Sequence, residues 1–123
     1  MAEVINARTE TGATPLYMAA DENQATTVRL LLQRGADVHA ALTDSPGTTA
    51  LFAAAAQGHA QVAALLLAAG ARPDGLVHSD ATPTSTPLHA AARGGHETLV
   101  TLLIRANAKV KKGSVMKAVI VRT

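Results

Sequence analysis

Cysteine and tryptophan are absent from this chain of 123 residues, which has one phenylalanine and one tyrosine. Without cysteine the chain forms no disulfide, no thiolate zinc site and no thiol nucleophile, a composition that suits a reducing compartment. A single compact core in a chain of this length would normally recruit aromatic side chains, because each buries a large apolar area. Their scarcity favours thin layers that pack through small and aliphatic residues.

Long apolar runs are also missing. The most apolar segment, residues 60–71, is rich in alanine and is far shorter than the roughly 18 residues of a membrane-spanning helix. The chain does not start with the charged stretch and apolar core of a secretory signal peptide. We therefore expect a cytoplasmic protein, with the nucleus as the alternative location, that does not bind membranes.

Acidic residues are absent from one end of the chain. Residues 105–123 contain six Lys or Arg and no acid, whereas residues 1–104 contain five Arg and nine acids. A basic tail can bind nucleic acid or anionic lipid. However, no aromatic side chain interrupts this tail for base stacking, and cations near a helix C-terminus stabilise the helix dipole. We therefore predict no nucleic-acid or lipid partner.

The sequence does contain one pattern in three copies, each beginning with threonine. The copies are residues 14–20, 49–55 and 86–92. An aliphatic triple follows each copy, at residues 30–32, 65–67 and 102–104. The three threonines are 35 and then 37 residues apart. Repetition at this period is typical of a solenoid built from stacked supersecondary units.

Each copy predicts a pair of helices. The first threonine can cap a helix by accepting a hydrogen bond from a free backbone N–H group, and a following proline suits the first helical turn. The alanines that come next leave room for a neighbouring helix. Turn residues end this helix; they are Asn23-Gln24, Gly58-His59 and Gly95-His96. A second helix runs through the aliphatic triple to Gly35, Gly70 or Asn107, where we expect a left-handed residue.

This pattern resembles the ankyrin repeat, in which Thr-Pro-Leu-His, Ala-Ala, Gly-His and Leu-Leu-Leu-x-x-Gly-Ala follow one another. Residues 12–36, 47–71 and 84–108 match it. The resemblance implies a single all-α domain, an ankyrin-repeat solenoid of stacked helix-turn-helix units with β-turn fingers. The repeats would span residues 6–39, 40–74 and 75–111, followed by a basic C-terminal segment at 112–123.

The chain departs from the family pattern at two histidine positions. Tyr17 and Phe52 stand where the third copy has His89, and Gln24 stands where the later copies have a turn histidine. In the family, the first of these histidines commonly bonds neighbouring backbone. We expect ring packing to replace those bonds in the first two repeats.

The segments that the resemblance assigns to fingers lengthen along the chain. The intervals are 8 residues from Asn6 to Thr14, 10 from His39 to Thr49 and 12 from Asp74 to Thr86. The second and third fingers should therefore be longer than usual. Polar insertions are tolerated at such tips because they bury nothing.

The sequence contains little that supports a catalytic or metal site. His78 and Asp80 share one finger, but no third ligand or base stands at a useful spacing, so they are interpreted as turn formers. The framework positions of His59, His89 and His96 favour bonded structural imidazoles. We predict no catalytic residue, no metal and no cofactor, and we expect that the chain is not an enzyme.

The resemblance implies that fingers and first helices line a concave face, where variable residues select a partner protein or peptide. The finger candidates are Glu10, Thr11, Asp44, Ser45, Thr48, His78, Ser79, Asp80, Thr82 and Ser85. The helix-end candidates are Asp21, Glu22, Arg34, Gln57 and Arg93. Acids outnumber arginines in this set, so we expect a partner with a basic segment.

Two classes of function remain open at this stage. The first is a non-catalytic protein-interaction module or scaffold, acting as a monomer. The second is a regulatory ankyrin segment of a larger enzyme, channel or ubiquitin-ligase adaptor, whose activity would reside in other sequence. Fold alone does not decide between them.

The C-terminal segment generates a first prediction. Val115, Met116, Val119 and Ile120 form one stripe of a helix that Ser114 can cap. If this helix covers the open end of the third repeat, deleting residues 114–123 should lower the melting temperature. If the stripe instead joins two chains, the deletion should yield a stable protein that sediments as a monomer where the full chain is a dimer.

Overall fold

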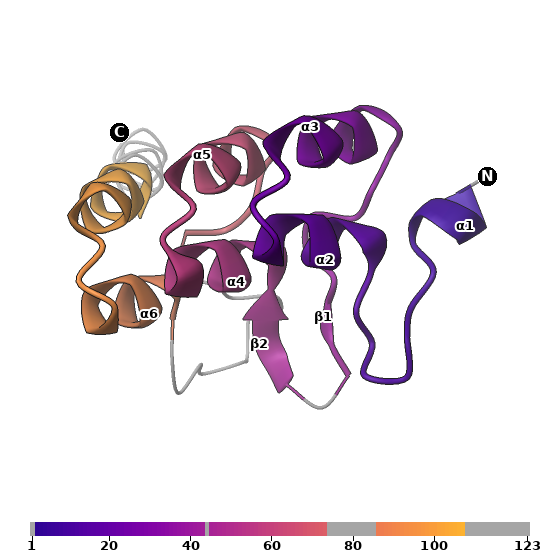
Figure 1. Ribbon diagram of the computed structural model, residues 1–123, viewed down its shortest axis with the longest axis horizontal. Coiled ribbons are helices and arrows are strands. Elements are labelled where there is room, and N and C mark those ends of the chain that lie inside the picture. The colour runs from indigo at the N-terminus through magenta and orange to yellow at the C-terminus, as the bar shows by residue number, and fades with distance from the viewer. Residues whose placement is uncertain (1, 44, 74–85, 108–123) are drawn as a thin grey trace, which may run out of the picture.

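The computed structural model describes residues 2–43, 45–73 and 86–107 (Figure 1). Its helices and strands, in chain order, are α1 (Ala2–Ile5), α2 (Pro15–Asp21), α3 (Ala25–Gln33), β1 (Ala41–Leu42), β2 (Ser45–Thr49), α4 (Ala50–Gln57), α5 (Ala60–Ala68) and α6 (Pro87–Arg93). Residues 97–107 are also helical. Strands β1 and β2 pair antiparallel, with an irregularity between Ala41 and Leu42.

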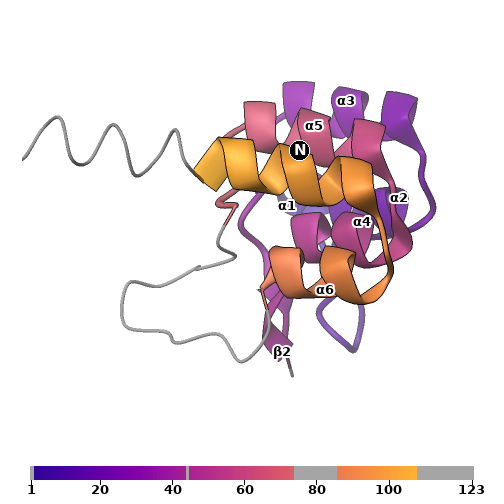
Figure 2. The ribbon, with the colours of Figure 1, turned by 90° about the vertical axis from the view of Figure 1, so that its left-hand side faces the viewer.

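The helices form two layers. Helices α2, α4 and α6 lie side by side in one layer, and α3, α5 and the helix at 97–107 form the other (Figure 1). The segment before α2 and the pair β1–β2 project from the first layer as fingers (Figure 2). This arrangement confirms the expected all-α solenoid of helix-turn-helix units, with strand structure confined to a finger among the described residues.

Threonine caps set where the first helices begin. The hydroxyl of Thr14 accepts a hydrogen bond from the backbone N–H of Tyr17 at 3.2 Å, and Thr49 accepts one from Phe52 at 3.3 Å. In the third repeat His89 donates its N–H to Thr86 at 3.2 Å, and Nδ1 of His89 accepts from the N–H of Thr86 at 3.2 Å. Each bond satisfies a donor that the first helical turn leaves free.

The turns between paired helices use a left-handed residue at one repeat position. Asn23, Gly58 and Gly95 have φ angles of 60°, 81° and 71°. The expected left-handed residue after the second helix is present at Gly35 and Gly70, with φ of 93° and 101°. The expectation for Asn107 was wrong, because residue 107 is still helical. Asparagine has a Cβ, so it is less strongly drawn than glycine to end a helix in that conformation.

The core consists of alanine and branched aliphatic side chains that successive repeats bury against one another. Fully buried positions include Ala20, Val28, Ala54, Ala55, Val62, Ala63, Leu66 and Ala91. Alanine on α2, α4 and α6 brings their backbones close, and leucine and valine from the other layer fill the space between the layers. No aromatic ring is needed, as the composition indicated.

The third repeat lacks a following neighbour among the described residues. Leu88 is 37% exposed, whereas Leu16 and Leu51, at the same repeat position, are each 1% exposed. The predicted helix after Ser114 and the whole of the third finger lie outside the described residues. Leu88 is therefore partly accessible on the side of the third repeat that faces away from the second.

The central repeat should be the most sensitive to loss of core volume. Leu66 is completely buried, whereas Leu31, at the same position in the first repeat, is only half-buried. Leu66→Ala should lower the free energy of unfolding by about 2–5 kcal/mol, and Leu31→Ala by clearly less. Urea titration of both variants measures the difference. Equal losses would contradict the nearest-neighbour account of stability.

Gly70 offers a test of backbone strain without side-chain collision. Nothing lies within 4 Å of a Cβ built at Gly70, although its φ is 101°. Gly70→Val should therefore cost about 1–3 kcal/mol through the backbone conformation alone. Ala69→Val is the matched control, because Ala69 has a φ of −84°. Thermal unfolding should show a lower melting temperature for Gly70→Val than for Ala69→Val.

Candidate interaction surface

Hydrogen bonds between the first two fingers hold them together. The backbone N–H of Thr43 donates to the carbonyl of Thr11 at 3.0 Å. Arg8 donates from Nη1 to the carbonyls of Ala41, at 2.7 Å, and Gly12, at 3.2 Å. A Cβ at Gly12 would collide with Thr43, so glycine allows this close approach. Sequence reasoning missed Arg8, because no local pattern shows that a finger 33 residues away supplies its partner.

The finger candidates divide into those that the structure describes and those that it does not. Glu10 and Thr11 are exposed on the first finger, and Thr48 is half-buried on β2. Ser45 begins β2. The remaining finger candidates lie outside the described residues; they are Asp44, His78, Ser79, Asp80, Thr82 and Ser85.

A second group of candidates meets at the turn end of α2 and α4. Nε2 of Gln57 donates to Oδ1 of Asp21 at 3.3 Å, across two neighbouring repeats. The carbonyl of Asp21 is 3.1 Å from Nε2 of His59, which donates as the N–H tautomer. Glu22 is exposed next to them. Asp21 is therefore held at both its side chain and its backbone by the second repeat.

The same bond recurs one repeat further along. Nε2 of His96 is 3.2 Å from the carbonyl of Ala56, which occupies the repeat position of Asp21. The ring of His96 also lies against the preceding turn, since a Cβ at Gly58 would be 2.7 Å from it. The first repeat has Gln24 instead, whose side chain reaches only the carbonyl of Glu22 at 3.4 Å. Together with the His89 cap, these bonds confirm the expected structural roles of the three histidines.

Two side chains on α2 add an apolar element to this surface. Met18 is 53% exposed, and with 3.6 residues per turn it lies almost opposite the buried Leu16. Tyr17 is half-buried, and its burial, together with the charge of Asp21, raises the pKa of its phenol above the usual 10.0. Sequence reasoning did not name Met18, although its place on the helix could have identified it as an exposed apolar residue.

The two candidate arginines are in different layers. Arg93 is the last residue of α6, in the same layer as α2 and α4. Arg34 follows α3, which runs antiparallel to α2 for nine residues, or about 13 Å. Arg34 is thus at the opposite end of the helix pair from Asp21 and Glu22. The structure groups Asp21, Glu22 and Gln57 and does not add Arg34 to them.

The described residues form no arrangement suited to metal binding or to a membrane span. Within residues 2–43, 45–73 and 86–107, no three His, Cys, Asp or Glu side chains are grouped so that they could hold a metal ion. In the same ranges, no helix is both long and apolar enough to span a bilayer. The polar groups of the turn end bond to one another or face solvent.

Stacked helix pairs with projecting fingers define a repeat solenoid, and comparison with known proteins identifies its kind. Residues 38–116 match a family model described as ankyrin repeats in three copies, and residues 11–42 match the model of a single ankyrin repeat. The chain belongs to the ankyrin repeat family. Proteins of this family are generally non-catalytic modules for protein–protein interaction.

The similar curated proteins are far longer than this chain. Human ankyrin repeat domain-containing protein 17 and its mouse counterpart are each 45% identical to it over 67 residues. Human ankyrin repeat and KH domain-containing protein 1 shows the same identity over the same length. Each match covers 54% of this chain and 3% of the relative.

Proposed function

We propose that the chain is a non-catalytic interaction module that binds a partner protein or peptide, through a basic segment, at the concave surface of its fingers and first helices. The observation that carries this proposal is the turn end of α2, where Asp21 and Glu22 present two carboxylates beside an exposed Met18. Such a surface can contact the charged head and the aliphatic stem of a lysine or arginine together.

Rigidity supports the same conclusion. Asp21 is fixed by Gln57 and His59 of the next repeat, and the fingers are joined by Arg8. Groups that are already held in place lose little conformational entropy when a partner binds. A surface with few exposed apolar side chains can therefore still bind a partner with measurable affinity. We also propose that the protein is located in the cytoplasm or the nucleus, because a chain without cysteine suits compartments in which disulfides do not form.

Opposite charge also accounts for selectivity. Among the described concave candidates, Glu10, Asp21 and Glu22 are acidic and Arg93 is the one arginine. Complementary charges speed encounter and disfavour partners of like charge. An acidic partner would be repelled at the α2 turn end.

A second proposal rests on the size of the relatives. Because each curated match covers 3% of a much longer protein, the same surface could act in cis or in trans as the regulatory segment of an enzyme, channel or ubiquitin-ligase adaptor. The complete reading frame that contains this sequence distinguishes this proposal from a free-standing module.

Charge reversal at the α2 turn end tests the proposal. A displayed library of random dodecapeptides is selected on the wild-type protein, and enriched peptides are synthesised and titrated by fluorescence anisotropy. We expect peptides rich in Lys and Arg whose binding weakens about tenfold or more with Asp21→Lys/Glu22→Lys. The salt dependence should flatten, because fewer charge contacts remain to be screened.

The controls separate binding from folding. The melting temperature should stay nearly unchanged, because the Gln57–Asp21 bond is exposed and contributes little. Glu97→Lys reverses one carboxylate on the other helix layer, half the charge change of the double variant, and should leave binding intact. If the selected peptides ignore the Asp21 and Glu22 changes but lose their affinity when Lys109, Lys111 and Lys112 are replaced, the basic tail is the binding site and the concave proposal is wrong.

A further inference from the structure

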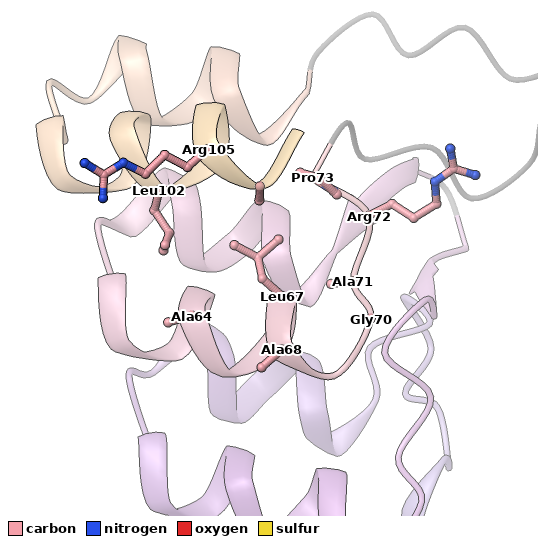
Figure 3. A pocket seen from close by; sticks show the side chains of 10 residues that line it. Ala64, Leu67, Ala68, Gly70, Ala71, Arg72, Pro73, Leu102 and Arg105 are labelled. Atoms are coloured by element: carbon pink, nitrogen blue, oxygen red, sulfur yellow. The ribbon is translucent and has the colours of Figure 1, made fainter. Parts of the chain in front are cut away.

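A groove lies in the other helix layer, between α5 and the helix at 97–107 (Figure 3). It has a volume of about 720 Å³, within the roughly 300–1,000 Å³ of ligand-binding pockets. Leu67 and Leu102 face it from the two helices, and Ala71 and Pro73, which follow α5, also line it. This groove is separate from the concave surface, which is formed by the fingers and the first helices.

Two alanines explain why the groove is open. Ala64 and Ala68 are exposed on α5 and line the groove. The same positions on α3 are Arg29 and Gln33, whose long side chains can cover the neighbouring space. The second repeat therefore has small residues where the first has large ones. The apolar walls of the groove are left accessible by this difference.

Two arginines contribute to the groove. Among the residues that the structure describes, its lining includes Arg72 and Arg105 and no acidic residue. In Figure 3 the two guanidinium groups lie on opposite sides of the apolar lining. Arg105 also begins the stretch of the sequence that contains six cations and no acid. An apolar floor beside the Arg105 cation is complementary to an apolar side chain with a carboxylate next to it.

We propose that this groove is a second docking site, for a peptide segment in which a large aliphatic or aromatic side chain lies next to aspartate or glutamate. The apolar side chain would enter between Leu67 and Leu102, and a carboxylate would bond the guanidinium group of Arg105. The two helix layers then select partners of opposite charge. One stack could in this way bring a basic and an acidic partner together.

Filling the groove tests the proposal directly. Ala68→Gln installs the residue that the first repeat has at this exposed position, so folding should be preserved. Ala92→Gln makes the same change on an exposed alanine of α6, away from the groove. Arg105→Glu reverses one flanking charge, and Arg29→Glu is its matched control on α3. Circular dichroism and thermal unfolding verify that all four variants are folded.

The probes are peptides from the displayed dodecapeptide library that bind wild-type protein in the presence of saturating concave-face peptide. We expect acidic sequences with a central Leu, Ile or Phe, whose dissociation constants rise about tenfold or more with Ala68→Gln and with Arg105→Glu. Ala92→Gln, Arg29→Glu and the Asp21→Lys/Glu22→Lys variant should leave their affinity unchanged. Unchanged affinity in the Asp21→Lys/Glu22→Lys variant distinguishes this site from the concave surface.

Two outcomes would overturn the proposal. In one, none of the recovered peptides depends on Ala68 or Arg105, and the groove is then no docking site. In the other, sedimentation equilibrium shows that wild-type protein self-associates and that Ala68→Gln abolishes this association. The groove would then hold a second copy of the chain and not a partner peptide.

Discussion

The close approach of successive helix pairs is the constraint on which the rest of this structure depends. Alanines that are completely buried, among them Ala20, Ala55 and Ala91, bring α2, α4 and α6 together, so that each pair covers the apolar side of the next. A single pair could not bury these residues by itself. Stability is therefore distributed over interfaces between neighbours, and Leu88 shows what happens where a described neighbour is lacking.

Hydrogen bonds across those interfaces turn a row of helices into a rigid surface. His59 and His96 each bind a carbonyl of the preceding repeat, and the left-handed turns allow their rings to lie close to it. Arg8 likewise joins the first two fingers, by donating a hydrogen bond to the carbonyl of Ala41. Bonds from Gln57 and His59 hold Asp21 in place. A surface of this kind suits recognition, because its groups are already ordered.

The two helix layers differ in the chemistry of their outward-facing side chains. On the first layer, positions opposite the alanines face outward, and there the chain has Met18, Asp21 and Glu22. On the second layer, the outward positions of α5 are alanine, and arginines flank the groove that results. The framework is the same in each repeat. The opposite charge of the two surfaces comes from a few substitutions on that framework.

The sequence by itself determined the repeat architecture, the helix starts at Thr14, Thr49 and Thr86, and the left-handed ends at Gly35 and Gly70. These features depend on local preferences that a period of 35 to 37 residues repeats three times. Asn107 shows the limit of such preferences, because a residue that only tolerates the left-handed conformation need not adopt it. The tertiary structure alone decided which distant residues meet: Gln57 with Asp21, Arg8 with Ala41, and α5 with the helix at 97–107 around the groove. Partners separated by more than thirty residues leave no local signal, since their contact depends on how closely whole repeats pack.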